Sequence, residues 1–150
     1  MILPHPISLL IKERGNQEKV MAFGTFDIFH LGHKSYLKQA RELGDELIVV
    51  VARDETVEKV KGNSSRNNEL RRLKKVKENQ LQDKVVLGSL ENKYEILKKY
   101  RPDIIALGYD QKVDIDELKN KLSEFNVNTE IVRLNSYKPE IYKSSKLKAQ

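Results

Sequence analysis

The 150-residue sequence contains no cysteine, only four prolines and no apolar run near the length of a membrane span. Without thiols the chain can form neither disulfides nor thiolate metal sites, which is compatible with a reducing compartment. A membrane-spanning helix needs about 20 consecutive apolar residues, and the apolar segment 6–11 is also too short for a signal peptide. We therefore expect a cytoplasmic protein that does not enter the membrane.

Charged residues, by contrast, make up 33% of the chain, with 28 Lys and Arg against 22 Asp and Glu. The resulting net charge of +6 suits anionic ligands such as nucleotides, and it would also suit nucleic acid. A lysine-rich solubilising surface would give the same excess. The length predicts a single domain with a sizeable core.

Apolar runs and helical periodicity alternate along the chain. The predicted strands cover 19–23, 47–52, 84–87, 103–107 and 129–134, and the predicted helices cover 31–43, 69–80, 94–100 and 115–125. This alternation predicts an α/β fold, a Rossmann-like open sheet of five parallel strands with helices on both faces. Residues 1–18 form an N-terminal extension of unclear role, and 19–150 form the domain.

Three details of this assignment are specific enough to be tested. The polar, basic segment 53–68 is predicted to be a loop. In the helix after it, Leu70, Leu73 and Val76 are predicted to form the apolar stripe. Gly44 is predicted to end the first helix as its C′ glycine.

The most informative stretch is 21–33, in which an apolar strand ends in a tight turn that carries two histidines. His30 and His33 stand three residues apart, directly at the start of a predicted helix. A helix N-terminus attracts phosphates, and two imidazoles add donors that can meet charge developing on a phosphate. Alternatively, the pair could belong to a zinc site, although zinc usually takes three or four protein ligands. The histidines could also only cap the helix and fill the turn.

Two other polar stretches, 53–54 and 108–111, also follow predicted strands. In open parallel sheets, ligands bind beyond the carboxyl ends of the strands, at the point where the strand order reverses. We therefore expect both stretches to lie near the histidine turn and to form one pocket with it.

The motif Gly24-Thr25-Phe26-Asp27 followed by His30-x-Gly32-His33 resembles the signature of the cytidylyltransferase-like nucleotidyltransferases. These enzymes join a phosphorylated acceptor to a nucleotide and release pyrophosphate. The resemblance extends from Lys19 to the C-terminus. The stretches 44–57, 87–93 and 101–111 further resemble the archaeal FAD synthase branch. This resemblance implies the reaction of FMN with ATP to FAD and pyrophosphate, a divalent cation such as Mg²⁺, and a homodimer.

The resemblance also implies roles for individual residues. His30 and His33 would hold the triphosphate and stabilise the transition state at the α-phosphorus. The other implied nucleotide-binding residues are Thr25, Phe26, Leu31, Gly32, Asp110, Tyr137, Ser144 and Ser145. The implied contacts to the acceptor or its phosphate are Asp27, Lys61, Arg71 and Lys143. The metal would bridge phosphate oxygens, so no protein side chain is expected to ligate it.

Two rival functions fit parts of the same pattern. One is a cytidylyltransferase acting on glycerol 3-phosphate or another small phosphorylated alcohol. The other is a non-catalytic nucleotide-binding or RNA-binding module, whose binding to nucleic acid would depend steeply on salt. The presence of both histidines together with Asp110 favours an enzyme, so we expect no nucleic-acid partner.

Overall fold

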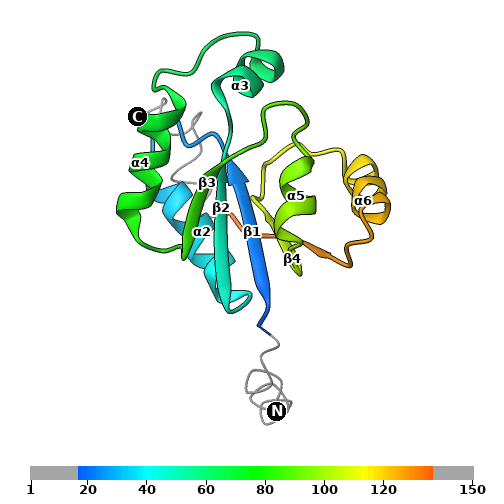
Figure 1. The fold of residues 1–150 in the computed structure, drawn as a ribbon. Coiled ribbons are helices and arrows are strands. Elements are labelled where there is room, and N and C mark those ends of the chain that lie inside the picture. The colour runs from blue at the N-terminus through cyan, green and yellow to red at the C-terminus, as the bar shows by residue number, and fades with distance from the viewer. Residues whose placement is uncertain (1–16, 137–150) are drawn as a thin grey trace.

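The computed structural model describes residues 17–136, which contain an open sheet of five strands (Figure 1). The strand order is β3-β2-β1-β4-β5, and every neighbouring pair is parallel. The strands are β1 Lys19–Gly24, β2 Glu46–Val51, β3 Lys84–Leu87, β4 Ile104–Leu107 and β5 Glu130–Arg133. This confirms the predicted sheet.

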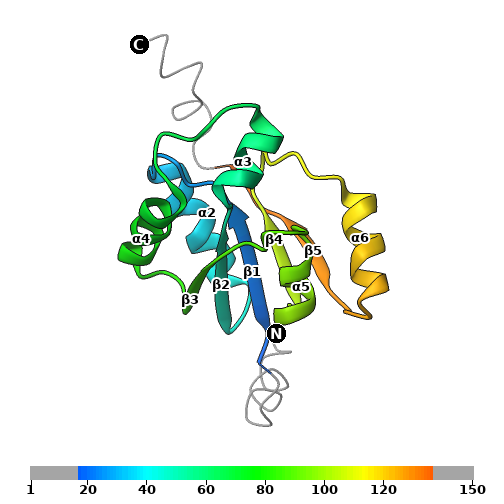
Figure 2. The same cartoon turned by 45° about the horizontal axis from the view of Figure 1, so that its top comes forward.

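Helices cover both faces of the sheet, as expected. They are α2 Leu31–Glu42, α3 Asp54–Lys61, α4 Glu69–Asn79, α5 Glu95–Tyr100 and α6 Ile115–Glu124. The pair α2 and α4 packs on one face and the pair α5 and α6 on the other (Figure 2). Within residues 17–136, no helix is both long enough and apolar enough to cross a membrane.

The central strand β2 shows why an unbroken apolar run is needed in this fold. Leu47, Val49 and Val51 belong to the core beneath α2 and α4, whereas Ile48 and Val50 belong to the core beneath α5 and α6. A parallel strand that is covered on both faces has no solvent side to place polar residues on. The predicted burial of this strand on both faces is confirmed.

The prediction of a loop over residues 53–68 is wrong for its first half, which forms the short helix α3. Asp54 and Glu55 lie in its first turn and Lys59 and Lys61 in its last turn, an arrangement that complements the helix dipole. Gly62 ends the helix in the left-handed conformation with φ 81°. Only Val57 is buried, so apolar periodicity is almost absent.

The predicted apolar stripe of α4 is wrong at Leu70. This side chain is 64% exposed, whereas Arg72 is 1% exposed and Val76 is fully buried. The helix therefore presents the Arg72 side of its surface to the core. The physical reason is that the guanidinium finds three hydrogen-bond acceptors there, as described below.

Gly44 follows the C-cap of α2, as expected, but it does not adopt the left-handed conformation assumed for a C′ glycine. A Cβ atom at this position would lie 2.7 Å from Cγ2 of Val20 and 2.8 Å from the carbonyl oxygen of Glu18. The glycine is therefore required because the chain passes β1 too closely for a side chain.

Candidate active site

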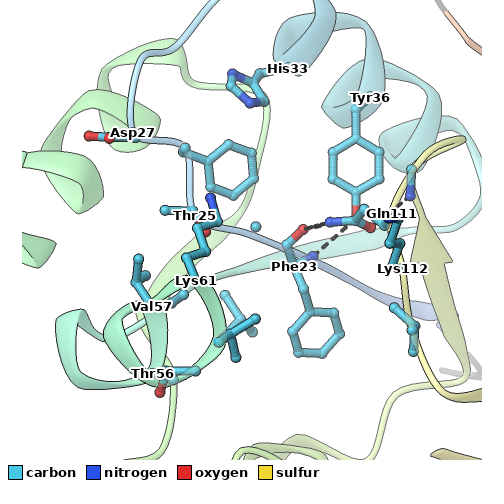
Figure 3. Close-up of a pocket in the computed structure, with 18 of the residues that line it drawn as sticks. Phe23, Thr25, Asp27, His33, Tyr36, Thr56, Val57, Lys61, Gln111 and Lys112 are labelled. Carbon is cyan, nitrogen blue, oxygen red and sulfur yellow. Dashed lines mark hydrogen bonds between the residues drawn. The ribbon is translucent and has the colours of Figure 1, made fainter. Parts of the chain in front are cut away.

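A cleft of about 1210 Å³ opens at the carboxyl edge of the sheet (Figure 3). Its walls include most of the histidine turn, Arg53 after β2, and residues 108–111 after β4. Helix α3 forms a further wall, with Thr56, Val57 and Lys61 facing the cleft. The expectation that the ends of β1, β2 and β4 meet in one pocket is confirmed.

The cleft begins where β1 and β4 part. Strand β1 stays paired with β2 as far as Gly24, but its pairing with β4 ends at Ala22. The carbonyl oxygen of Phe23 instead accepts a hydrogen bond of 2.7 Å from Nε2 of Gln111 (Figure 3). Oε1 of Gln111 accepts one of 2.8 Å from the N–H of Gly108. One amide side chain thus bridges the two strands across the opening.

The turn after β1 is held in an unusual backbone conformation. Phe26 has φ 55°, which is uncommon for a bulky residue, and its ring is buried. A Cβ atom on Gly24 would lie 2.7 Å from this ring, so only glycine fits beneath it. The ring meets His33 edge to face, with the ring centroids 5.2 Å apart. Phe26 thereby supports the second histidine of the motif.

Asp27 anchors this turn to the loop between α3 and α4. Its carboxylate accepts hydrogen bonds of 2.8 Å from the backbone N–H groups of Arg66 and Asn67. Desolvation opposes ionisation, but the bonds from Arg66 and Asn67 outweigh it and lower the pKa of Asp27. The structure thus gives Asp27 an anchoring role, and its predicted contact with substrate stays a prediction.

The two histidines form a capping box at the start of α2. Nδ1 of His30 accepts a hydrogen bond of 3.0 Å from the N–H of Gly32, and Nδ1 of His33 accepts one of 3.3 Å from the N–H of His30. Their rings are stacked with centroids 3.9 Å apart. Because each Nδ1 is an acceptor, each neutral ring carries its proton on Nε2. His30 therefore keeps its Nε2–H as a donor for a ligand, whereas His33 also has a hydrogen bond with the backbone of Ile28.

His33 remains neutral well below pH 7. Burial lowers its pKa to about 4, and the neighbouring charges of His30 and Lys61 also lower it. A hydrogen bond with the backbone of Ile28 acts in the opposite direction. An imidazole that stays neutral acts as a hydrogen-bond donor rather than as a cation or a proton source. Its N–H can thus stabilise phosphate charge at the helix N-terminus.

Positive side chains dominate the rest of the cleft. Besides the histidines, the lining contains Arg53, Lys61, Arg66, Lys93 and Lys112, against the carboxylates of Asp27 and Asp110. Arg53 is held in place, since its Nε–H donates to the carbonyl oxygen of Gly88 over 2.7 Å and Nη1 lies 3.2 Å from Glu69. A cleft with this excess of positive over negative side chains suits a polyphosphate.

The structure brings together most of the predicted site residues that it describes. Those that line the cleft are Thr25, Phe26, Asp27, His30, Gly32, His33, Lys61 and Asp110. Leu31 is 48% exposed and does not line the cleft, and Arg71 lines a separate hollow of about 420 Å³. Tyr137, Lys143, Ser144 and Ser145 lie outside the described residues, so their roles stay predictions.

Two residues with structural contacts to this site were not identified from the sequence. The hydroxyl of Tyr36, on α2, hydrogen-bonds to β1 and β4 where these strands separate. Nη1 of Arg72, on α4, donates a hydrogen bond of 2.9 Å to the carbonyl oxygen of Thr25. Helical spacing places Tyr36 in the core, but it does not show what its hydroxyl contacts. Nothing in the sequence distinguishes Arg72 from Arg71.

Known proteins are similar to this chain in sequence, and a solved structure is similar to it in fold. The FAD synthase of Thermococcus sibiricus is 45% identical over 131 residues, which are 86% of this chain and 88% of that protein. The FAD synthase of Thermoplasma acidophilum is 46% identical over 127 residues, which are 85% and 89% of the two chains.

Similarity extends to a crystal structure described as a lipopolysaccharide core biosynthesis protein from Thermoplasma volcanium. That structure superposes with a TM-score of 0.75 at 43% identity, over 81% of this chain and 98% of its own. The cytidylyltransferase-like family matches residues 21–150, nearly the whole chain. This chain therefore belongs to the cytidylyltransferase-like family.

Proposed function

We propose that this protein transfers the AMP part of ATP to the phosphate of FMN, giving FAD and pyrophosphate. The observation that carries the proposal is the stacked pair His30 and His33, whose imidazoles place N–H donors for a phosphate at the N-terminus of α2. The cleft around them, about 1210 Å³, exceeds the roughly 300–1,000 Å³ of a typical site for one small ligand. It therefore has room for a nucleotide and an acceptor side by side.

The reaction needs no nucleophilic side chain. An oxygen of the FMN phosphate attacks the α-phosphorus of ATP, and the bond from the α-phosphorus to the oxygen bridging to the β-phosphorus breaks. That bonding pair leaves with pyrophosphate, so no proton has to be transferred. His30 and His33 donate hydrogen bonds to phosphate oxygens as their charge increases, while Lys61 attracts the phosphates.

A divalent cation fits this scheme as a partner of ATP rather than of the protein. Among residues 17–136, no group of three or more His, Asp or Glu side chains is arranged to hold a metal ion. Bound to the triphosphate, the ion would neutralise phosphate charge and make pyrophosphate a better leaving group. The cationic side chains of the cleft would hold the phosphates in position.

The apolar part of the cleft favours FMN over a small phosphorylated alcohol. Val60 of α3 is 72% exposed and Ile28 is 54% exposed, and both line this otherwise cationic cleft. Large apolar side chains left exposed in a cleft suit a flat apolar ligand such as the isoalloxazine ring, whereas glycerol 3-phosphate has no such surface. We assign the attraction of the FMN phosphate to Lys61, which follows Val60 and also lines the cleft.

The two substrates can be assigned to opposite sides of the cleft. Helix α3, with Thr56, Val57 and Lys61, lies on one side, and Gln111 and Lys112 lie on the other (Figure 3). We assign α3 to the flavin, and the end of β4 to the nucleotide. This arrangement leaves the histidine turn available to the phosphates between them.

A product assay by mass spectrometry tests the proposal. ATP or CTP is offered with FMN or glycerol 3-phosphate, in the presence of Mg²⁺, to the wild-type protein and to His33→Ala. We expect FAD only from ATP with FMN, and much less of it from the variant. CDP-glycerol from CTP and glycerol 3-phosphate would instead support the rival transferase. Ligand binding without any product would support a non-catalytic module.

Assembly and location complete the proposal. We infer a cytoplasmic homodimer that binds neither membrane nor nucleic acid. Sedimentation velocity at two protein concentrations tests the dimer, and a single species at the monomer mass would contradict it.

A further inference from the structure

Arg72 of α4 is 1% exposed, and its guanidinium is hydrogen-bonded in three directions. Nε–H donates to the carbonyl oxygen of Asn67 over 2.9 Å, and Nη1 donates to that of Thr25 over 2.9 Å. Nη2 donates over 2.8 Å to Oδ1 of Asp54, with which it forms an ion pair. A buried charge is costly unless it is paired and hydrogen-bonded, and here both conditions are met.

The three acceptors belong to three different segments around the cleft. Thr25 lies in the turn that leads to His30 and His33. Asp54 is the first residue of α3, the helix that ends at Lys61. Asn67 lies in the loop that binds the carboxylate of Asp27.

The start of α3 is also tied to the start of α4. The N–H of Asp54 donates to Oε1 of Glu69 over 2.9 Å, and the N–H of Glu69 donates to Oδ2 of Asp54 over 3.2 Å. The hydrogen bond from Arg72 is the main cause that lowers the pKa of Asp54, so this carboxylate stays ionised. Movement of α3 would therefore break bonds at both oxygens of Asp54.

We propose that Arg72 is a positioning residue for the nucleotidyl transfer, because one guanidinium fixes the spacing between the turn that carries His30 and His33 and the helix that carries Lys61. The inference rests on the proposed function. A guanidinium presents N–H groups in a rigid planar fork, whereas a lysine presents a single nitrogen. A lysine at this position could neutralise Asp54 but could not reach three acceptors that diverge.

Arg72→Lys is therefore the decisive variant, with Lys77→Met on the exposed face of the same helix as control. We expect Arg72→Lys to lower kcat about 10²-fold while KM for ATP changes less than about threefold, since the catalytic donors are displaced but remain present. Circular dichroism at the assay temperature identifies the folded fraction to which kcat is referred. Wild-type kcat per folded molecule in Arg72→Lys would overturn the inference.

Asp54→Ala provides a second variant that keeps two of the three contacts of Arg72. In this variant α3 loses its bond to Arg72, while the turn and the loop keep theirs, so we expect KM for FMN to rise about tenfold and kcat to fall less than in Arg72→Lys. Equal effects of both variants on kcat and both KM values would indicate a merely structural role and would overturn the inference.

Nitrogen NMR of the imidazoles gives a readout that does not require activity. In the wild type we expect His30 and His33 as Nε2–H tautomers with unprotonated Nδ1. In Arg72→Lys we expect mixed tautomers and titration of His33 at a higher pH, because the turn is no longer fixed. An unchanged histidine spectrum in that variant would overturn the inference. Absence of FAD formation by the wild type would overturn only the proposed function.

Discussion

The hydroxyl of Tyr36 donates a hydrogen bond of 2.6 Å to the carbonyl oxygen of Ala106 and accepts one of 3.0 Å from the N–H of Phe23. These two backbone groups lie where β1 and β4 separate, because Ala106 is the partner of Ala22 in the last paired position and Phe23 follows Ala22 directly. The phenol therefore takes the place of a bond between the strands. The sheet can open at its switch point because a side chain from α2 satisfies the groups that the opening exposes.

Removing that hydroxyl should weaken the fold at the base of the cleft. Tyr36→Phe leaves the N–H of Phe23 and the carbonyl of Ala106 without this partner, and an unsatisfied buried group costs about 1–3 kcal/mol. We expect the free energy of unfolding in urea to fall by about that amount. Tyr100→Phe is the control, since the Tyr100 hydroxyl makes no hydrogen bond within residues 17–136. Equal stability of the two variants would contradict the assignment.

The capping and catalytic roles of His30 can be separated by one substitution. Asparagine is a good N-cap residue, so His30→Asn should keep the bond from the N–H of Gly32 and change stability by less than about 1 kcal/mol. It lacks the Nε2–H donor, and the loss of one such donor typically costs about 10²–10³ in kcat. Urea unfolding checks the small change in stability, and steady-state kinetics of the same sample check the loss of kcat. Wild-type turnover in His30→Asn would show that this histidine only caps the helix.

The low pKa of His33 makes a prediction about stability at acidic pH. The unfolded chain titrates this residue near pH 6.5 and the folded chain near pH 4, so between these values the unfolded state binds more protons. Stability must then fall as pH falls through this window, by about 1–3 kcal/mol after allowance for partial exposure. Glutamine suits this position of a capping box, so His33→Gln should fold, and it should lose less stability than the wild type over the same pH range. If the free energy of unfolding fell equally in both proteins from pH 7 to pH 4, the lowered pKa of His33 would be contradicted.

Most of the fold follows from the sequence because the central strands β1, β2 and β4 are largely buried. Runs such as 47–52 contain no polar residue, and only a covered parallel strand uses such a run. Helix α3 was not predicted because it buries a single apolar side chain, Val57, which lines the cleft. Its acidic first turn, its lysines and Gly62 were the available signals, and they are weaker than periodicity.

The site was predictable where it depends on strand ends, and less so where it depends on side-chain direction. The stretch 108–111 was expected at the cleft, but that Gln111 bridges β1 and β4 depends on how far the strands separate. The sequence does not predict the role of Arg72, because a buried arginine is exceptional and the apolar pattern of α4 indicates a different face. Its burial depends on acceptors from segments 5 to 47 residues away in sequence.

The assignment of α3 to the flavin predicts a selective loss of acceptor binding. Val60→Asp places a carboxylate on the exposed apolar surface that we assign to the isoalloxazine ring, close to where the FMN phosphate must enter. We expect KM for FMN to rise about tenfold or more and KM for ATP to change little, because about 1.4 kcal/mol of lost binding is a factor of ten. Leu70 is also apolar and exposed but lies outside the cleft, so Leu70→Asp should leave both KM values unchanged. If Val60→Asp raised KM for ATP instead, the nucleotide rather than the flavin would lie against α3.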